Sequence, residues 1–206
     1  MLGYERLAVS RISRGLVDIK SFHDTIDVAD LLVRLAQIVR SRRHSGGLRP
    51  VQWEILRYLS HANRISRCPG FLALYLGTTR GTVSQTLITL EKKGLITRER
   101  NAFDGRGTLL NLTAKGRRTA ASDPLQELRT VTESMTGGAA LGEGLRDLLG
   151  QMQKLGDLKP FGVCRDCGHF HQEAEADRDH FCDTLNEPVS EEDTHLICLE
   201  FNPEAT

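Results

Sequence analysis

Hydrophobic residues recur at helical spacing through much of the chain, and the segment 79–93 shows the pattern most clearly. One face of this segment is apolar, whereas the opposite face carries small or polar side chains. The residues of the apolar face are Val83, Leu87 and Leu90. Thr79 offers a hydroxyl that can cap the first turn, and Gly94 suits the left-handed conformation that ends a helix. We therefore predict an amphipathic helix here, preceded by the short apolar run 71–76 and a turn at Gly77.

Two short runs of strand-forming residues follow this helix, at 95–98 and 108–112. They flank a polar loop that contains Asp104-Gly105, a dipeptide typical of hairpin turns. The order of helix, turn, capped helix and hairpin predicts a winged helix-turn-helix, whose second helix enters the major groove of DNA. A winged helix with a purely structural role is the alternative, because a fold does not fix a function.

A more specific comparison, with a known protein family, is possible for residues 90–116, whose sequence is LEKKGLITRERNAFDGRGTLLNLTAKG. It resembles the end of the recognition helix and the wing of the MarR family of bacterial transcription regulators. The resemblance extends over roughly residues 26–155. It implies a homodimer, with the first long helix contributing to the dimer interface. Two recognition helices would then lie one turn of DNA apart, on a near-palindromic operator.

A recognition helix needs short polar side chains where it approaches the base edges. The residues predicted to contact double-stranded DNA are Thr79, Arg80, Gly81, Thr82, Ser84, Gln85, Thr89, Arg98 and Arg106. Gln85 is the candidate for an adenine contact, and Arg80 for a guanine or phosphate contact. Arg98 is expected to contact the DNA backbone, and so to position the protein on the duplex. Arg106 matches the wing arginine of the family, which enters the minor groove.

The expected fold is mainly α with a small β-wing, in three parts. Residues 1–25 form an N-terminal extension without an assigned function. Residues 26–155 hold the winged helix-turn-helix and the dimerisation helices. Residues 161–206 form a small cysteine-rich, metal-stapled module. We expect a length of 206 residues to hold one ordinary domain plus a small extra module.

Helices are predicted on both sides of the winged motif. The segment 26–44 carries a broad apolar stripe, and a second helix begins at Pro50 and places Trp53 in the core. After the wing, helix is expected from 113 to 135, interrupted near Asp123-Pro124. A last amphipathic helix follows Gly137-Gly138 and ends near Leu155.

Charge is divided unequally between the two parts of the chain, although the formal net charge is zero. Residues 1–120 contain 21 Lys and Arg against 9 Asp and Glu, a net charge of +12. Residues 121–206 contain 6 against 18, a net charge of −12. Such a division indicates nucleic-acid contact by the basic part, with a chance imbalance of solvated faces as the alternative.

Several function classes find no support in the sequence. It has no apolar run of the ~18 residues that a membrane helix needs, and its first residues have no signal-peptide pattern, so a cytoplasmic protein is expected. It also contains no His-Glu-x-x-His, phosphate-loop or nucleophile-elbow motif, so we expect no enzymatic activity.

Four of the five cysteines lie near the C-terminus, in the pattern Cys164-x2-Cys167-x14-Cys182-x15-Cys198. The segment around them is acidic and poor in large apolar residues, and below about 40 residues a fold usually needs a metal or disulfides. Because thiols stay reduced in the cytoplasm, metal binding is favoured over disulfides. Cys68 stands apart and is expected to be a small buried residue.

The nature of the metal is less constrained. Zinc takes four thiolates, but its ribbons usually bring two Cys-x-x-Cys knuckles, and only one is present. The cysteine spacing resembles that of high-potential iron–sulfur proteins, and the opening is similar to cluster-bearing small subunits of some glycyl-radical enzymes. An iron–sulfur cluster is therefore favoured over a structural Zn²⁺ ion. His169 and His180 are reserve ligands.

Two functions remain open. In the first, the protein is a homodimeric transcriptional regulator, expected to be a repressor, whose cysteine module senses iron or redox state. In the second, the module is a structural zinc site or docks a partner, and the regulator responds to a small molecule.

Overall fold

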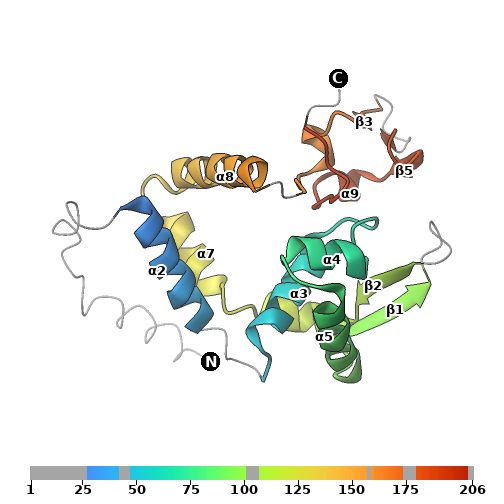
Figure 1. The fold of residues 1–206 in the computed structure, drawn as a ribbon, viewed down its shortest axis with the longest axis horizontal. Helices are drawn as coiled ribbons and strands as arrows, with labels where there is room; N and C mark the ends of the chain where they lie inside the picture. Colours follow the sequence, from blue (N-terminus) through green and yellow to red (C-terminus); the bar gives the residue numbers. More distant parts are fainter. Residues whose placement is uncertain (1–26, 42–46, 101–106, 157–158, 174–179, 204–206) are drawn as a thin grey trace, which may run out of the picture. The chain divides into compact units, whose positions relative to one another are not determined.

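The computed structural model describes residues 27–41, 47–100, 107–156, 159–173 and 180–203 (Figure 1). The chain divides into two compact units, residues 1–42 and residues 43–206. The described part of the first unit is the helix α2 (Val28–Ser41). Apolar side chains on α2 are exposed, and they include Val28, Leu31, Val33, Leu35 and Ile38.

The second unit begins with a winged helix. Its elements are α3 (Pro50–His61), α4 (Pro69–Tyr75), α5 (Arg80–Lys92), β1 (Ile96–Arg100) and β2 (Thr108–Leu112). The two strands pair antiparallel, with Ile96 opposite Leu112 and Arg100 opposite Thr108. Gly77 and Gly94, before and after α5, have positive φ angles, which glycine adopts without a steric cost. The predicted helix, turn, capped helix and hairpin are therefore present.

One hydrophobic core joins the three helices and the wing. Its fully buried side chains include Ile55 and Leu56 of α3, Leu72 of α4, and Leu87 and Leu90 of α5. The apolar face predicted for the segment 79–93 faces this core, since its three residues are each about 1% exposed or less. The predicted burial of Trp53 is also confirmed, at 3% exposure.

Two small residues, Thr113 and Gly116, determine how the chain continues from the wing into the next helix. Thr113 caps α6 (Ala114–Ala121), because its Oγ1 accepts a hydrogen bond of 2.9 Å from the Gly116 N–H. Gly116 packs so closely on the chain that a Cβ added there would lie 1.9 Å from the Leu95 carbonyl oxygen. The Thr-x-x-Gly pattern of the sequence is therefore a requirement of packing between α6 and the start of the wing.

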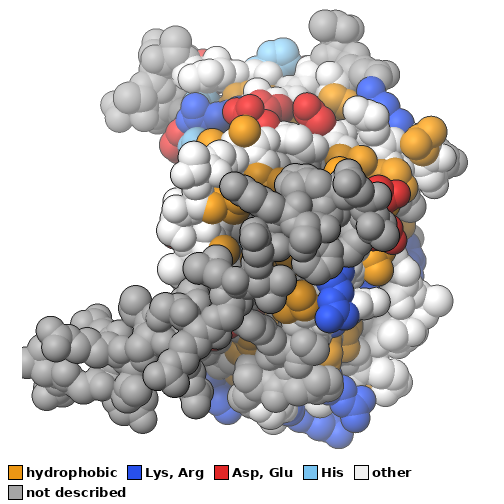
Figure 2. Space-filling model, turned by 90° about the vertical axis from the view of Figure 1, so that its left-hand side faces the viewer, with side chains coloured by type: hydrophobic (Ala, Val, Ile, Leu, Met, Phe, Trp, Pro, Cys, Tyr) orange, Lys and Arg blue, Asp and Glu red, His pale blue; other side chains and the backbone are white. Residues whose placement is uncertain are grey.

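Two further helices follow α6, namely α7 (Gln126–Ser134) and α8 (Gly138–Leu155). The predicted interruption near Asp123-Pro124 separates α6 from α7. Figure 2 shows hydrophobic side chains at the surface on one face of the molecule. The exposed apolar residues of α7 and α8 are Leu128, Val131, Leu141, Leu145, Leu148, Leu149, Met152 and Leu155. No described helix is long and apolar enough to cross a membrane.

The C-terminal region forms a small β-module. It contains the 3₁₀ turn η2 (Cys164–Asp166) and the short helix α9 (Glu191–Thr194). Its three antiparallel strands, in the order β3-β4-β5, are β3 (Phe170–His171), β4 (His180–Cys182) and β5 (Glu187–Val189). Its buried hydrophobic cluster is small, because only Cys164, Cys182 and Val189 form it, with Phe170 and Leu185 packed against them.

The C-terminal module packs against the winged helix. Leu199 is 1% exposed and belongs to the core of the winged helix. Ala62, directly after α3, forms a parallel bridge with Ile197. Phe161, where the module begins, packs against Tyr75 of α4 with 5.2 Å between ring centroids. Both ends of the module therefore rest on α3 and α4.

The predicted fold class is confirmed for the helices and the wing, and the C-terminal region is the small module expected. Cys68 differs from expectation, because it is half-buried at the N-cap of α4 and not fully buried. The prediction of metal stapling stays a prediction. Residues 1–25 lie outside the described part of the chain.

Candidate nucleic-acid interface

The predicted DNA-reading face of α5 is turned to the surface. Exposed side chains along it are those of Thr79, Arg80, Thr82, Gln85 and Thr89, with Gly81 also exposed and Ser84 half-buried. A recognition helix must combine a buried apolar face with an accessible polar face of little bulk. The burial pattern of α5 meets both conditions, and contact of these residues with DNA stays a prediction.

Three of the threonines also make hydrogen bonds that stabilise α5. The Thr79 Oγ1 accepts a hydrogen bond of 3.2 Å from the Thr82 N–H and so caps α5. The hydroxyls of Thr79 and Thr82 also lie 3.0 Å apart and share a hydrogen bond. The Thr89 hydroxyl donates to the Gln85 carbonyl at 3.1 Å. Among the candidate residues on α5, the exposed amide of Gln85 is thus the group best suited to pair with a base edge.

The two candidate arginines differ in their surroundings. Arg80, at the first position of α5, places its guanidinium beside Gly70, because a Cβ at Gly70 would lie 3.5 Å from the Arg80 Nη2. Arg98 on β1 is half-buried, and its Nε lies 3.2 Å from a carboxylate oxygen of Glu91 on α5. Arg98 therefore contacts the C-terminal end of α5, and its contact with the DNA backbone stays a prediction.

The wing arginine Arg106, with Asp104 and Gly105, lies outside the described residues. The first described strand of the wing ends at Arg100, and the second begins at Thr108. The prediction that Arg106 enters the minor groove stays a prediction.

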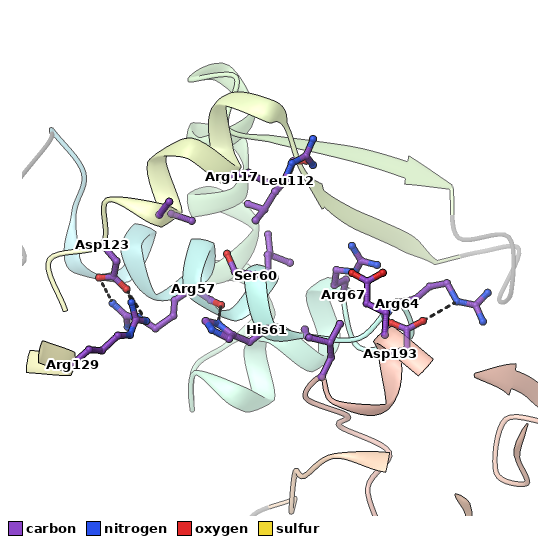
Figure 3. A pocket seen from close by; sticks show the side chains of 16 residues that line it. Arg57, Ser60, His61, Arg64, Arg67, Leu112, Arg117, Asp123, Arg129 and Asp193 are labelled. Carbon is purple, nitrogen blue, oxygen red and sulfur yellow. Dashed lines mark hydrogen bonds and ion pairs between the residues drawn. The ribbon is translucent and has the colours of Figure 1, made fainter. Parts of the chain in front are cut away.

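An ion-pair network that the sequence did not indicate lies behind this interface (Figure 3). Asp123, which is 3% exposed, accepts hydrogen bonds from Arg57 at 2.6 and 2.9 Å, and Arg129 lies 3.7 Å away. Burial acts to raise the pKa of Asp123, but the hydrogen bonds from Arg57 outweigh it and hold the pKa below its usual value. The network ties the segment between α6 and α7 to α3.

These residues line a cavity of about 640 Å³ beside α3 and α6. Its lining carries charged side chains of both signs, with arginines more numerous than carboxylates. The charged and histidine residues of the lining are Arg57, His61, Arg64, Arg67, Arg117, Arg129, Asp123, Glu192 and Asp193. Figure 3 shows Arg64 directed toward Asp193, a residue of α9, so the C-terminal module forms one wall of the cavity.

The thiols of the C-terminal module lie near one another. The Cys164 thiol donates a hydrogen bond to the Cys198 sulfur, which lowers the pKa of Cys198 to about 6 and raises that of Cys164. Burial raises the pKa of Cys182, and the nearby Cys198 and Cys167 add to the effect. Among the described residues, no group of three or more cysteine, histidine or carboxylate side chains is arranged to hold a metal ion.

The two reserve ligands are engaged elsewhere. His180 uses both ring nitrogens, since its Nδ1 accepts from the Glu173 N–H at 3.1 Å and its Nε2 lies 2.6 Å from Glu191. The His169 Nε2 lies 3.4 Å from the side-chain amide of Asn202. Glu191 also contacts Arg165 and His195, and its pKa falls to about 2, chiefly because His180 and then His195 bond to it. His180 is therefore a structural partner of Glu191.

Comparisons with known proteins define the class of the winged segment. Residues 46–107 match the sequence model of the MarR family. This segment is therefore similar to the MarR family over the residues that form the winged helix. The family match ends at residue 107 and lends no support to a likeness with high-potential iron–sulfur proteins.

Solved structures agree on the fold. FabT from Streptococcus pneumoniae, in complex with DNA, has a TM-score of 0.51 and 23% identity, over 62% of this chain and 96% of that chain. CouR from Rhodococcus jostii RHA1, bound to p-coumaroyl-CoA, has a TM-score of 0.51 and 22% identity, over 61% of this chain and 91% of that chain. A comparison with curated proteins yields no match.

Proposed function

We propose that this protein is a DNA-binding transcriptional regulator that reads its operator with α5. The observation that carries the proposal is the accessible polar face of α5, held on a winged helix of the MarR type. The net charge of +12 in residues 1–120 supports it, because phosphate contacts supply much of the affinity for DNA. FabT, whose structure contains DNA, shares the fold.

We infer further that the regulator is a homodimer on a near-palindromic operator, and acts as a repressor. The exposed apolar side chains of α2 and those of α7 and α8 support this inference, since surfaces of this kind are usually covered by another chain. Light scattering on the purified protein is expected to give twice the chain mass of 22.9 kDa. A monomer at micromolar concentration would contradict it.

The direct test of DNA reading is the substitution Gln85→Ala. It is expected to relax preference at one operator position by about 1–3 kcal/mol, because a bidentate amide–adenine pair is lost. Selection of bound sequences from a random library measures the preference. The matched control is Gln151→Ala, on the exposed surface of α8. Equal base preferences for the Gln85 variant and the unchanged protein would contradict the proposal.

The wing offers a second readout of the same proposal. Arg106→Ala is expected to weaken binding to all sequences alike and to reduce the slope of log K against log salt by about 1, because one phosphate-region charge is lost. An unchanged salt slope would remove Arg106 from the interface.

The cavity beside α3 and α6 favours a second candidate function, a regulator that responds to a small molecule. Its arginine-rich lining suits an anionic effector, and CouR, bound to p-coumaroyl-CoA, shows that the fold accommodates one. Release of DNA on addition of acyl-CoA thioesters or aromatic carboxylates, measured by fluorescence anisotropy, tests it. Arg57→Ala is expected to abolish such a response.

The cysteine module gives the first candidate its regulatory element. We propose that it binds a metal centre, either an iron–sulfur cluster that senses iron or redox state or a structural zinc ion. The nearness of the Cys164 and Cys198 thiols and the small hydrophobic cluster of the module support metal binding. An absorption spectrum of the anaerobically purified protein distinguishes a brown cluster from a colourless zinc protein.

A further inference from the structure

The C-terminal module has a small hydrophobic cluster of its own. Its hydrophobic cluster consists of two cysteines and Val189, with two partly buried side chains against them. Small folds of this kind generally draw their stability from a disulfide or a metal. All five cysteines of the chain are free thiols. The rest of its apolar packing, through Phe161, Ile197 and Leu199, is against the core of the winged helix, and a bound metal would add to that stability.

Three separate segments bring the four thiols together. The first is η2 with its closing turn, where the Cys167 N–H donates to the Cys164 carbonyl at 2.9 Å. Cys182 stands on β4 opposite Phe170, whose N–H bonds to the Cys167 carbonyl at 3.1 Å. Cys198 is bridged to Gly162, two residues before Cys164. Backbone pairing thus joins the segments that carry the four cysteines.

Hydrogen-bond donors point at two of the sulfur atoms. The backbone N–H groups of Leu185 and Thr184 donate to the Cys182 sulfur, and that of Glu200 donates to the Cys198 sulfur. Amide donors of this kind stabilise a thiolate, which is the form of cysteine that binds a metal. Backbone N–H donors therefore already lie within reach of the Cys182 and Cys198 sulfur atoms.

Cys198 has two further partners, and these belong to the winged helix. Asn63 and Ser66, both fully buried in the turn between α3 and α4, have their side chains near the Cys198 sulfur. The Ser66 Oγ accepts the Leu199 N–H at 2.9 Å, and the Asn63 Oδ1 accepts the Ser66 N–H at 2.9 Å. The Asn63 Nδ2 has no partner at normal hydrogen-bond geometry among the described residues. A buried amide donor is thus available to a charged sulfur.

From these contacts we propose that Cys164, Cys167, Cys182 and Cys198 bind one Zn²⁺ ion as four thiolates, and that Asn63 and Ser66 are positioning residues for the Cys198 ligand. Binding requires thiol side chains to turn toward a common centre, since they do not yet surround one. It releases the remaining thiol protons to solvent. This proposal deepens the metal-binding part of the proposed function and does not depend on DNA binding.

The contact between Cys164 and Cys198 favours a single ion over a cluster. Zn–S bonds of about 2.3 Å in a tetrahedron place neighbouring sulfurs about 3.8 Å apart. That separation fits two sulfurs already in hydrogen-bond contact. A cluster would force them apart, because its iron atoms and sulfides lie between the cysteine ligands.

Because the ligand Cys198 is bonded to the turn between α3 and α4, the metal also affects the winged helix. This turn precedes α4 and α5, and Ile197 and Leu199, the neighbours of Cys198, are bonded to the same turn or buried in the same core. Zinc loading is therefore expected to slow amide hydrogen exchange at residues 62–66 as well as inside the module.

The first experiment titrates Co²⁺ and then Zn²⁺ into the full chain, reduced and free of metal. One Co²⁺ per chain with the intense absorption of a tetrahedral tetrathiolate, displaced by one Zn²⁺, is the expected result. Cys182→Ser is expected to lose this spectrum and Cys68→Ser to keep it. Protein with no tetrathiolate spectrum, or isolated with several irons and sulfides per chain, would overturn the proposal.

The second experiment tests the positioning residues. Ser66→Ala is expected to lower zinc affinity about 10–100-fold, as loss of a partner of a metal ligand does, and to shift the sulfur-to-cobalt charge-transfer band. The matched control is Ser60→Ala, whose hydroxyl bonds to the Leu56 carbonyl within α3. An unshifted band in the Ser66 variant would overturn the link to the winged helix, even if the metal still binds.

Discussion

The ion pair between Asp123 and Arg57 is expected to be a main stabilising contact behind the interface. Asp123 is 3% exposed, receives two hydrogen bonds from Arg57 and one of 3.0 Å from the Leu125 N–H. Asp123→Asn keeps the shape and the Leu125 bond but leaves the Arg57 charge without a carboxylate. Removing one partner of a buried pair costs about 3–5 kcal/mol, and the lower end applies because Arg57 stays 20% exposed.

The pH dependence follows from the direction of the pKa shift. The pKa of Asp123 is lower in the folded protein than the ordinary value of about 3.9. Its stabilisation is therefore complete above pH 3.9 and is lost as pH falls through the folded pKa. The unfolding free energy of the unchanged protein should exceed that of the Asp123→Asn variant by a constant amount from pH 7 to pH 5. This difference should shrink below pH 3.9.

Urea unfolding followed by circular dichroism at several pH values measures this difference. Asp147→Asn, which removes an exposed carboxylate of α8, is the matched control and should change stability by less than about 0.5 kcal/mol. A difference for Asp123→Asn that stays below 1 kcal/mol at pH 7, or that grows as pH falls, would refute the reasoning.

Two further substitutions test the packing at the wing and in the C-terminal module. Gly116→Ala is expected to cost about 3 kcal/mol in urea unfolding, because the new methyl would collide with a backbone oxygen at 1.9 Å. Gly144→Ala on α8, where the added group meets open space, should instead stabilise by about 0.5–1 kcal/mol, and equal effects would contradict the packing. Glu191→Gln is expected to speed amide exchange in β4 and β5 and leave α5 unchanged, because Glu191 joins His180 to η2. Exchange rates that change equally in both regions would show that the contact is not local.

The sequence was informative about the winged helix because its signals are local. A cap at Thr79, an apolar face at spacing of three and four residues, and glycines with positive φ at Gly77 and Gly94 act within one or two turns of chain. The same holds for the Thr113 cap of α6. These features predicted which face of α5 is buried and which is exposed.

The candidate site was only partly predictable. Residues such as Thr79 and Gln85 could be placed on one helical face from spacing alone, and they are exposed as expected. That Arg98 is engaged by Glu91 could not be foreseen, because the pairing depends on how β1 returns along α5. Asp123 was visible only as part of a helix-breaking dipeptide, since nothing in its neighbourhood along the chain indicates an arginine 66 residues earlier.

What the sequence by itself determined is thus the order of elements, the buried face of α5 and the presence of a thiol-rich module. Only the tertiary structure decided that Leu199 completes the core of the winged helix, and that Asn63 and Ser66 face Cys198. The spacing of hydrophobic residues predicts which side of a helix or strand is buried. It does not predict which distant segment of the chain covers that side. Contacts across more than 100 residues, such as that between Leu199 and Ser66, depend on the whole fold, and they join the thiol-rich module to the winged helix.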